Sequence, residues 1–198
     1  MSPAPGPRRE AHPLPRRGPG AGDPSDNSAP GHPEDPLGDP ESVARTACLK
    51  LLQQAPRTRS QLATKLSDRG VPAEVAQRVL DRFTEVGLID DASFARAWVD
   101  SRQRTRGLAS RALAGELRRR GVDRETVEQA LAQVNPDREE DTARDLVRRK
   151  LRATARLDDK ARARRLLGLL ARKGYSADLA GRVVRSELAD DESALAEE

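Results

Sequence analysis

Apolar and polar residues alternate with the periodicity of α-helices from Ser42 onward. The first run ends before Pro56, and the second opens on Thr58 and Gln61, which have the spacing of a helix-capping box. Gly70 is the expected left-handed terminator of this second helix, and a third helix is expected to end at Gly87. The predicted buried face of the first helix comprises Val43, Ala47, Cys48, Leu51 and Leu52. The predicted buried face of the third comprises Val75, Val79, Leu80, Phe83 and Val86.

The junction between the second and third helices recurs twice further along the chain. Residues 66–71, 117–122 and 170–175 each begin with Leu, have Gly at the fifth position and an apolar residue at the sixth. The next residue is suited to open a helix, as N-cap or as first-turn proline. These opening residues are Pro72, Asp123 and Ser176, and the expected staple partners of the apolar residues are Ala76, Val127 and Ala180. The recurrence predicts three tandem three-helix units, near residues 42–88, 89–135 and 136–189. Because alternating β-branched patterns are few, we predict an all-α fold without a sheet.

The two ends of the chain differ in composition from these units. Residues 1–41 hold 11 of the 14 prolines and 6 of the 14 glycines, without a periodic apolar pattern, and are predicted to be a disordered tail. Residues 190–198 are expected to be an acidic C-terminal tail. The longest apolar run, 166–171, is too short to span a bilayer, the start of the chain lacks a signal-like stretch, and Cys48 is the single cysteine. We therefore expect a soluble cytoplasmic protein.

Positive charge is concentrated in two parts of the chain. The formal charge is +4, and since residues 1–41 carry four arginines and seven acids, the remainder carries +7. Residues 102–124 contain eight arginines but only two acidic residues, and residues 144–173 contain twelve basic but only three acidic residues. Such clusters are either a solvated surface or a binding site for nucleic acid or an acidic protein surface, between which the sequence does not choose. The candidate binding residues are Arg102, Arg104, Arg106, Arg111, Arg118, Arg119, Arg120, Arg148, Arg149 and Lys150.

Sequence signatures of catalysis are missing. The chain has neither a Walker-type phosphate loop nor a GxSxG motif, and both histidines, His12 and His32, lie in the predicted tail. We expect one of the carboxylates of Asp90 and Asp91 to cap the following helix, and we do not interpret the pair as a metal site. No enzyme, cofactor or metal is therefore predicted. All four aromatic residues are at expected core positions, so we do not expect them to bind nucleic acid by stacking on its bases. These residues are Phe83, Phe94, Trp98 and Tyr175.

The order of several short motifs resembles the RecX family of recombinase regulators. Residues 87–91, Gly-Leu-Ile-Asp-Asp, followed by Phe94 and Ala95, are similar to the start of that family's middle repeat. The pattern continues in order and spacing, and Lys173-Gly174-Tyr175 is similar to its closing repeat. The intervening matches are Arg102, Gly107, Leu113, Glu116, Leu117, Arg120, Gly121 and Val122. The resemblance covers roughly residues 42–188, and the third unit departs from a regular helical pattern at Gly168 and Gly181, each of which costs ~1 kcal/mol relative to Ala.

The resemblance implies an elongated, curved array that lies in the groove of the RecA–DNA filament and presents a long face rather than a pocket. It also implies inhibition of the ATPase, strand-exchange and coprotease activities of RecA, with effects on DNA repair and the SOS response. A monomer is expected, with nonspecific contact to single- or double-stranded DNA as a further option. The alternatives are a helical module acting directly on duplex DNA and a scaffold for another acidic protein. Exposed acids expected on the third helix of the first unit, Glu74, Asp81 and Glu85, argue against its insertion into DNA.

Overall fold

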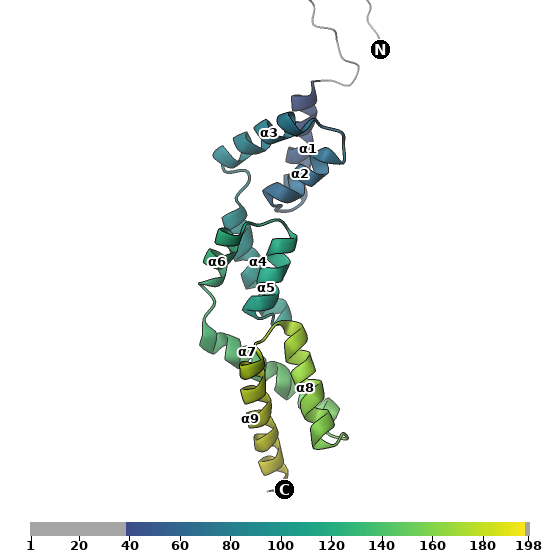
Figure 1. Ribbon diagram of the computed structural model, residues 1–198, viewed down its shortest axis with the longest axis vertical. Coiled ribbons are helices and arrows are strands. Elements are labelled where there is room, and N and C mark those ends of the chain that lie inside the picture. The colour runs from purple at the N-terminus through teal and green to yellow at the C-terminus, as the bar shows by residue number, and fades with distance from the viewer. Residues whose placement is uncertain (1–38, 197–198) are drawn as a thin grey trace, which may run out of the picture. The chain divides into compact units, whose positions relative to one another are not determined.

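The computed structural model describes residues 39–196, and the side chains of residues 39–193. Nearly all of the predicted N-terminal tail therefore lies outside the described residues. Within them the chain contains only helices and connecting turns, which confirms the all-α prediction (Figure 1). The helices are α1 (Pro40–Gln54), α2 (Arg59–Ser67), α3 (Ala73–Glu85), α4 (Asp91–Arg106), α5 (Ser110–Arg119), α6 (Arg124–Leu131), α7 (Pro136–Leu151), the short 3₁₀ turn η1 (Arg152–Thr154), α8 (Asp159–Lys173) and α9 (Ala177–Ala196).

The recurring Leu–Gly–apolar junctions are helix C-termini of one construction. Gly70, Gly121 and Gly174 adopt φ of 74°, 76° and 89°, which only glycine enters at little cost. Immediately after each glycine, the backbone N–H of the apolar residue reaches back to the carbonyl of the junction leucine at 3.1–3.2 Å. This bond satisfies a carbonyl that the end of the helix would leave without a partner. The apolar residues are all buried, as predicted, and comprise Val71, Val122 and Tyr175.

Side-chain caps fix where several helices begin. Thr58 and Gln61 form the predicted reciprocal capping box at α2. Asp123 caps α6 through the N–H of Thr126, and the Ser176 hydroxyl accepts from the N–H of Leu179 at the start of α9. Helix starts were therefore readable from short-range sequence patterns.

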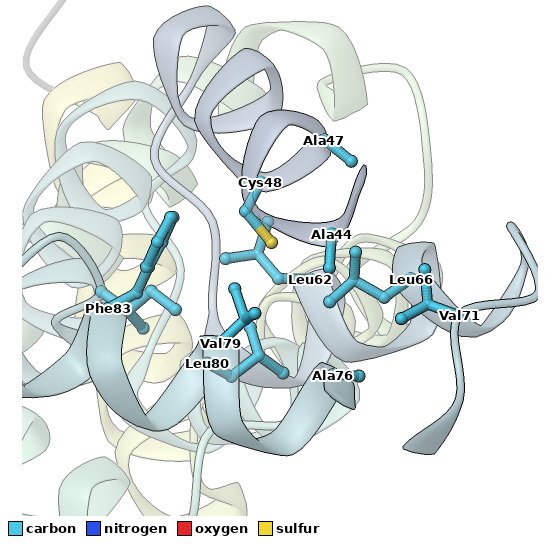
Figure 2. Packing of buried hydrophobic residues seen from close by; sticks show 11 residues of the cluster. Ala44, Ala47, Cys48, Leu62, Leu66, Val71, Ala76, Val79, Leu80 and Phe83 are labelled. Carbon is cyan, nitrogen blue, oxygen red and sulfur yellow. The ribbon is translucent and has the colours of Figure 1, made fainter. Parts of the chain in front are cut away.

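Each three-helix unit has its own apolar core. In the first, the Cys48 side chain and the leucines of α2 and α3 converge between the three helices (Figure 2). The cores of the second and third units are centred on Leu113 and Leu117 and on Leu166 and Leu170 respectively. The main apolar stabilisation is thus local to each unit.

Two apolar residues, Val86 and Val43, are exposed although the helical periodicity places them on buried faces. Val86 follows the end of α3 and is 50% exposed, because the helix ends one residue before it. Val43, on the first predicted face, is 41% exposed. The predicted faces therefore hold in the middle of the helices and fail toward their ends.

Successive units are joined by a repeated contact between a turn and the start of a helix. The Thr58 hydroxyl, at the N-cap of α2, donates to the carbonyl oxygen of Arg120 at 2.6 Å. At the equivalent place in the next pair, the N–H of Ala109, the N-cap of α5, donates to the carbonyl oxygen of Lys173 at 3.0 Å. In both cases the accepting residue directly precedes the junction glycine, so the same turn that ends a helix also docks on the preceding unit.

The second and third helices of the third unit, α8 and α9, are longer than their counterparts in the other two units. Helix α9 continues as far as Ala196, beyond residue 190, where the acidic tail was expected to begin. Asp191 in that extension forms an ion pair with the buried Arg162 of α8 at 2.5 Å.

No helix among the described residues has the length and apolar character needed to cross a membrane.

Candidate partner-binding surface

Two of the ten candidate residues, both arginines, are held in a cluster around Trp98. The guanidinium carbons of Arg102 and Arg120 lie 4.0 and 3.6 Å from the centre of its ring, within the range of cation–π attraction. The indole N–H donates to Glu116 at 2.8 Å, and the same carboxylate is 3.3 Å from Arg102. Phe94 stacks on the indole, with ring centres 5.8 Å apart. These two arginines therefore hold the middle unit together.

Burial alters the electrostatics of Arg120 without removing its charge. Its pKa is lowered from the usual value, chiefly because burial desolvates the guanidinium, while Glu116 opposes this effect. Arg102 and other neighbouring arginines lower the pKa further. An arginine so placed stays protonated near neutral pH and is engaged within its own unit.

Arg148 is a third candidate with a structural partner. Its Nε is 2.7 Å from the carboxylate of Glu187, a residue of α9 that is only 3% exposed. Arg144 contacts the same carboxylate at 3.4 Å, and the ion pair with Glu187 raises the pKa of Arg148. A buried carboxylate needs such compensation, so Arg148 contributes to joining α7 to α9.

The other seven candidates are exposed. Within residues 39–193 none of them takes part in an ion pair. They are Arg104, Arg106, Arg111, Arg118, Arg119, Arg149 and Lys150. Because no ion pair within this range neutralises their charges, these seven residues remain candidates for contact with a partner.

The structure gathers three of the seven at one open cleft of about 460 Å³. Arg104 and Arg106 reach it from the end of α4, and Arg149 from α7. Arg138 and Lys173 also line it, although sequence reasoning did not select them. Lys173 donates to the carbonyl oxygen of Arg106, which ties the α8–α9 turn to the end of α4. Asp100 and Asp145 line the same cleft, so the site is of mixed charge.

A second cleft, of about 860 Å³, lies between α5 and the segment formed by the end of α8 and the start of α9. Arg111 and Arg119 line it from α5, and Arg172 from α8. Arg118 and Lys150 line neither of the two clefts. The surface expected to lack a pocket is therefore hollowed in two places, both formed where helices of the second and third units meet.

The aromatic residues are only partly where the sequence analysis placed them. Phe83 and Tyr175 are buried, and burial raises the pKa of Tyr175 to about 12, while its hydroxyl donates to the carbonyl oxygen of Gly107 at 3.2 Å. Phe94 and Trp98 are half-buried at the edge of the middle core. Because the half-buried pair is stacked and flanked by arginines, these rings are not free platforms for bases.

The acidic pair before α4 is occupied with backbone contacts. Asp90 caps α4 by accepting from the N–H of Ser93 at 2.8 Å, and its hydrogen bonds to that residue lower its pKa. Asp91 accepts from the N–H of Arg59 at 2.9 Å, and burial raises the pKa of Asp91. The prediction that one carboxylate caps the helix is confirmed. In the part of the chain that the structure describes, no three His, Cys, Asp or Glu side chains gather as metal ligands would.

Three helical units in tandem, joined through repeated turn contacts and bearing exposed arginines around two clefts, define a helical-repeat protein. Each unit matches a family domain: the first, second and third three-helix domains of RecX match residues 44–83, 90–131 and 137–184. The chain belongs to the RecX family.

Relatives and solved structures agree with this assignment. The chain is 60% identical to "Regulatory protein RecX" of Thermobifida fusca over 145 residues, covering 73% of this chain and 78% of that protein. It is 55% identical to the protein of the same name from Streptomyces coelicolor, covering 79% and 84% respectively. The crystal structure of RecX from Lactobacillus salivarius superposes with a TM-score of 0.70 at 19% identity, covering 75% of this chain and 97% of that one. Similarity at that identity concerns the fold, whereas the high-identity relatives support a regulatory protein.

Proposed function

We propose that this protein binds the RecA–DNA filament and modulates, mainly inhibits, its ATPase, strand-exchange and coprotease activities. Through RecA it would affect DNA repair and the SOS response. The observation that carries the proposal is that all three units match RecX domains in order. We further propose that it acts in the cytoplasm, as a monomer, without catalytic activity of its own.

The exposed cationic residues support an electrostatic mode of binding. The seven unpaired candidates lie on α4, α5 and α7. A nucleoprotein filament offers both phosphates and acidic protein side chains to such residues. Exposed aromatic stacking platforms are not needed for this mode.

Direct action on duplex DNA is the second candidate function, favoured by the basic residues at the α4–α7 cleft. Against it, Glu74, Asp81 and Glu85 are exposed on α3, the helix that would enter the groove in the first unit. Filter binding to random duplex DNA, with and without RecA filaments, separates the two. Retention that depends on RecA supports filament binding, and equal retention on naked duplex supports the alternative.

The decisive experiment is a RecA ATPase assay on single-stranded DNA into which this protein is titrated. The proposal expects the rate to fall in proportion to the fraction of filament bound. An unchanged rate under conditions where cosedimentation shows the protein on the filament would contradict inhibition. An absence of cosedimentation would contradict filament binding itself.

Reversing the charge of Arg111 and Arg118 together should weaken filament binding markedly while leaving the helices intact. Both residues are exposed on α5, and exposed substitutions usually change stability by no more than ~0.5 kcal/mol. The loss should be greatest at low salt, where attraction between charges is least screened. The measurements are filament cosedimentation and ATPase inhibition across about 50–200 mM salt, a range in which phosphate contacts are strongly salt-dependent.

The matched control is Arg78→Glu with Arg82→Glu on α3, which changes the net charge equally at two other exposed arginines. This control should bind and inhibit like the parent. If the α5 variant also behaves like the parent at every salt concentration, those two arginines are ordinary solvated residues.

A further inference from the structure

The cleft between α5 and α8–α9, here called the α5 groove, has a floor of small residues. Gly115 and Ala112 line it from α5, and Gly181 and Ala180 line it from α9. Its volume of about 860 Å³ lies in the range of sites that take a ligand or several side chains. Glycine and alanine contribute little side-chain volume, so these four positions leave room in the groove for the side chains of a ligand.

The helix does not need glycine at either position. Gly115 and Gly181 lie within α5 and α9, away from the helix ends where left-handed backbone is used. A Cβ added at Gly115 would meet only the end of the Arg119 side chain at 3.4 Å, and one at Gly181 only the end of Arg185 at 3.3 Å. Each glycine costs a helix ~1 kcal/mol relative to Ala. Neither tight packing nor backbone conformation accounts for that cost at either position, and the missing side chains leave room in the groove.

The groove has a basic rim beside its apolar floor. Arg111, Arg119 and Arg172 are exposed around it and form no ion pairs among residues 39–193. Its one acidic lining residue, Glu116, is already engaged by Trp98 and Arg102. Leu167, 37% exposed, adds apolar surface at the edge. The uncompensated charge is therefore positive, next to a surface that suits aliphatic side chains.

We propose that the α5 groove binds an acidic, amphipathic protein segment. The apolar side chains of the segment lie on the floor between Gly115 and Gly181, and its carboxylates face the three rim arginines. Helix-in-groove recognition has this division between apolar anchors and charged edges. Nucleic acid fits less well, because phosphates gain nothing from an apolar floor and no free aromatic ring offers stacking. The proposal rests on the proposed function insofar as the recombinase is the partner expected to supply the segment.

Filling the groove tests the proposal without weakening the helices. In the variant with Gly115→Leu and Gly181→Leu, the new side chains occupy the floor, and the better helix formers should keep or raise the unfolding temperature. The probe is a synthetic helical peptide of Leu and Glu with its leucines on one face, followed by fluorescence anisotropy. The parent should bind it in a salt-sensitive manner, and the filled variant at least ~tenfold more weakly, a difference of ~1.4 kcal/mol.

Ala97→Leu is the control variant. Ala97 is exposed within α4 and does not line the groove, so the added side chain lies away from the floor and from the rim arginines. This variant should bind the peptide like the parent. A peptide of the same pattern with Lys in place of Glu should not bind, and a single-stranded oligonucleotide should bind the parent and the filled variant alike.

The outcomes separate this inference from the proposed function. The groove proposal is overturned if the parent protein does not bind the acidic peptide. It is also overturned if the filled variant binds the peptide as tightly as the parent does. A filled variant that is selectively impaired for the oligonucleotide assigns the groove to nucleic acid and also overturns it. RecA ATPase inhibition by the parent and both variants is measured in parallel. If only the filled variant loses inhibition, the groove is the site through which the protein inhibits RecA. If the parent does not inhibit RecA, the proposed function is wrong, and the peptide-binding result alone tests the groove proposal.

Discussion

Replacing Trp98 with alanine is expected to lower the free energy of unfolding by about 3 kcal/mol, the lower end of the range for truncation of a buried aromatic residue, because the indole is half-buried. The indole fills the edge of the middle core and contacts the guanidinium groups of Arg102 and Arg120. Removing it leaves two like charges facing a cavity and deprives Glu116 of an N–H donor. Thermal or urea unfolding followed by far-ultraviolet circular dichroism measures the change.

Trp98→Phe is the informative companion to that substitution. It keeps an aromatic face for both arginines and for Phe94 but removes the hydrogen bond to Glu116. The expected loss is about 1–2 kcal/mol from that hydrogen bond, with a smaller contribution from the lost ring area. An alanine variant that unfolds at the parental temperature would show that this side chain does not contribute to the core in solution.

The junction glycines should differ greatly in their tolerance of alanine, with Gly174→Ala more destabilising than Gly70→Ala. Both have positive φ, so each substitution carries a backbone cost of about 1–2 kcal/mol. At Gly174 the added Cβ would also lie 2.5 Å from the backbone nitrogen of Ala112, whereas nothing lies within 4 Å at Gly70. Relief of that overlap must separate the turn from α5, which adds about 1–3 kcal/mol.

The quantity to measure is the difference in unfolding free energy between these two alanine variants. Because both share the left-handed cost, that difference reports the contact between the second and third units. Gly121→Ala provides a second case, since its Cβ would lie 2.2 Å from that of Ser60. Equal destabilisation at Gly70 and Gly174 would mean that the turn does not pack against α5 as described.

The fold was predictable because its signals are short in range. A capping box such as Thr58 with Gln61 and a terminator such as Gly70 act within a few residues, and both are visible in the sequence. Repetition of the junction then gave the number of units. The same reasoning failed at Val86, because its helical position was extrapolated past the end of α3.

The candidate site was less predictable because charge composition does not reveal pairing across the fold. Arg148 contacts Glu187, a residue 39 positions away that the sequence gives no reason to single out. Arg102 and Arg120 meet at Trp98 only because α4 and the end of α5 pack together. Gly181 stands out in the sequence only as a helix irregularity, and its place in the α5 groove depends on how α5, α8 and α9 come together.

The Thr58 hydroxyl makes two hydrogen bonds, one within its own helix start and one to the next unit. It accepts from the N–H of Gln61 at 3.1 Å, which starts α2, and donates to Arg120 at 2.6 Å, which docks the second unit on the first. A fluctuation that frays the start of α2 therefore also releases its neighbour, and docking in turn suppresses the fraying. In the nearest-neighbour description of repeat proteins, this hydroxyl adds to the coupling energy as well as to the intrinsic stability of the unit. At the next junction a main-chain N–H, that of Ala109, makes the equivalent bond, so cooperativity there is carried by the backbone and persists through most side-chain substitutions at that position.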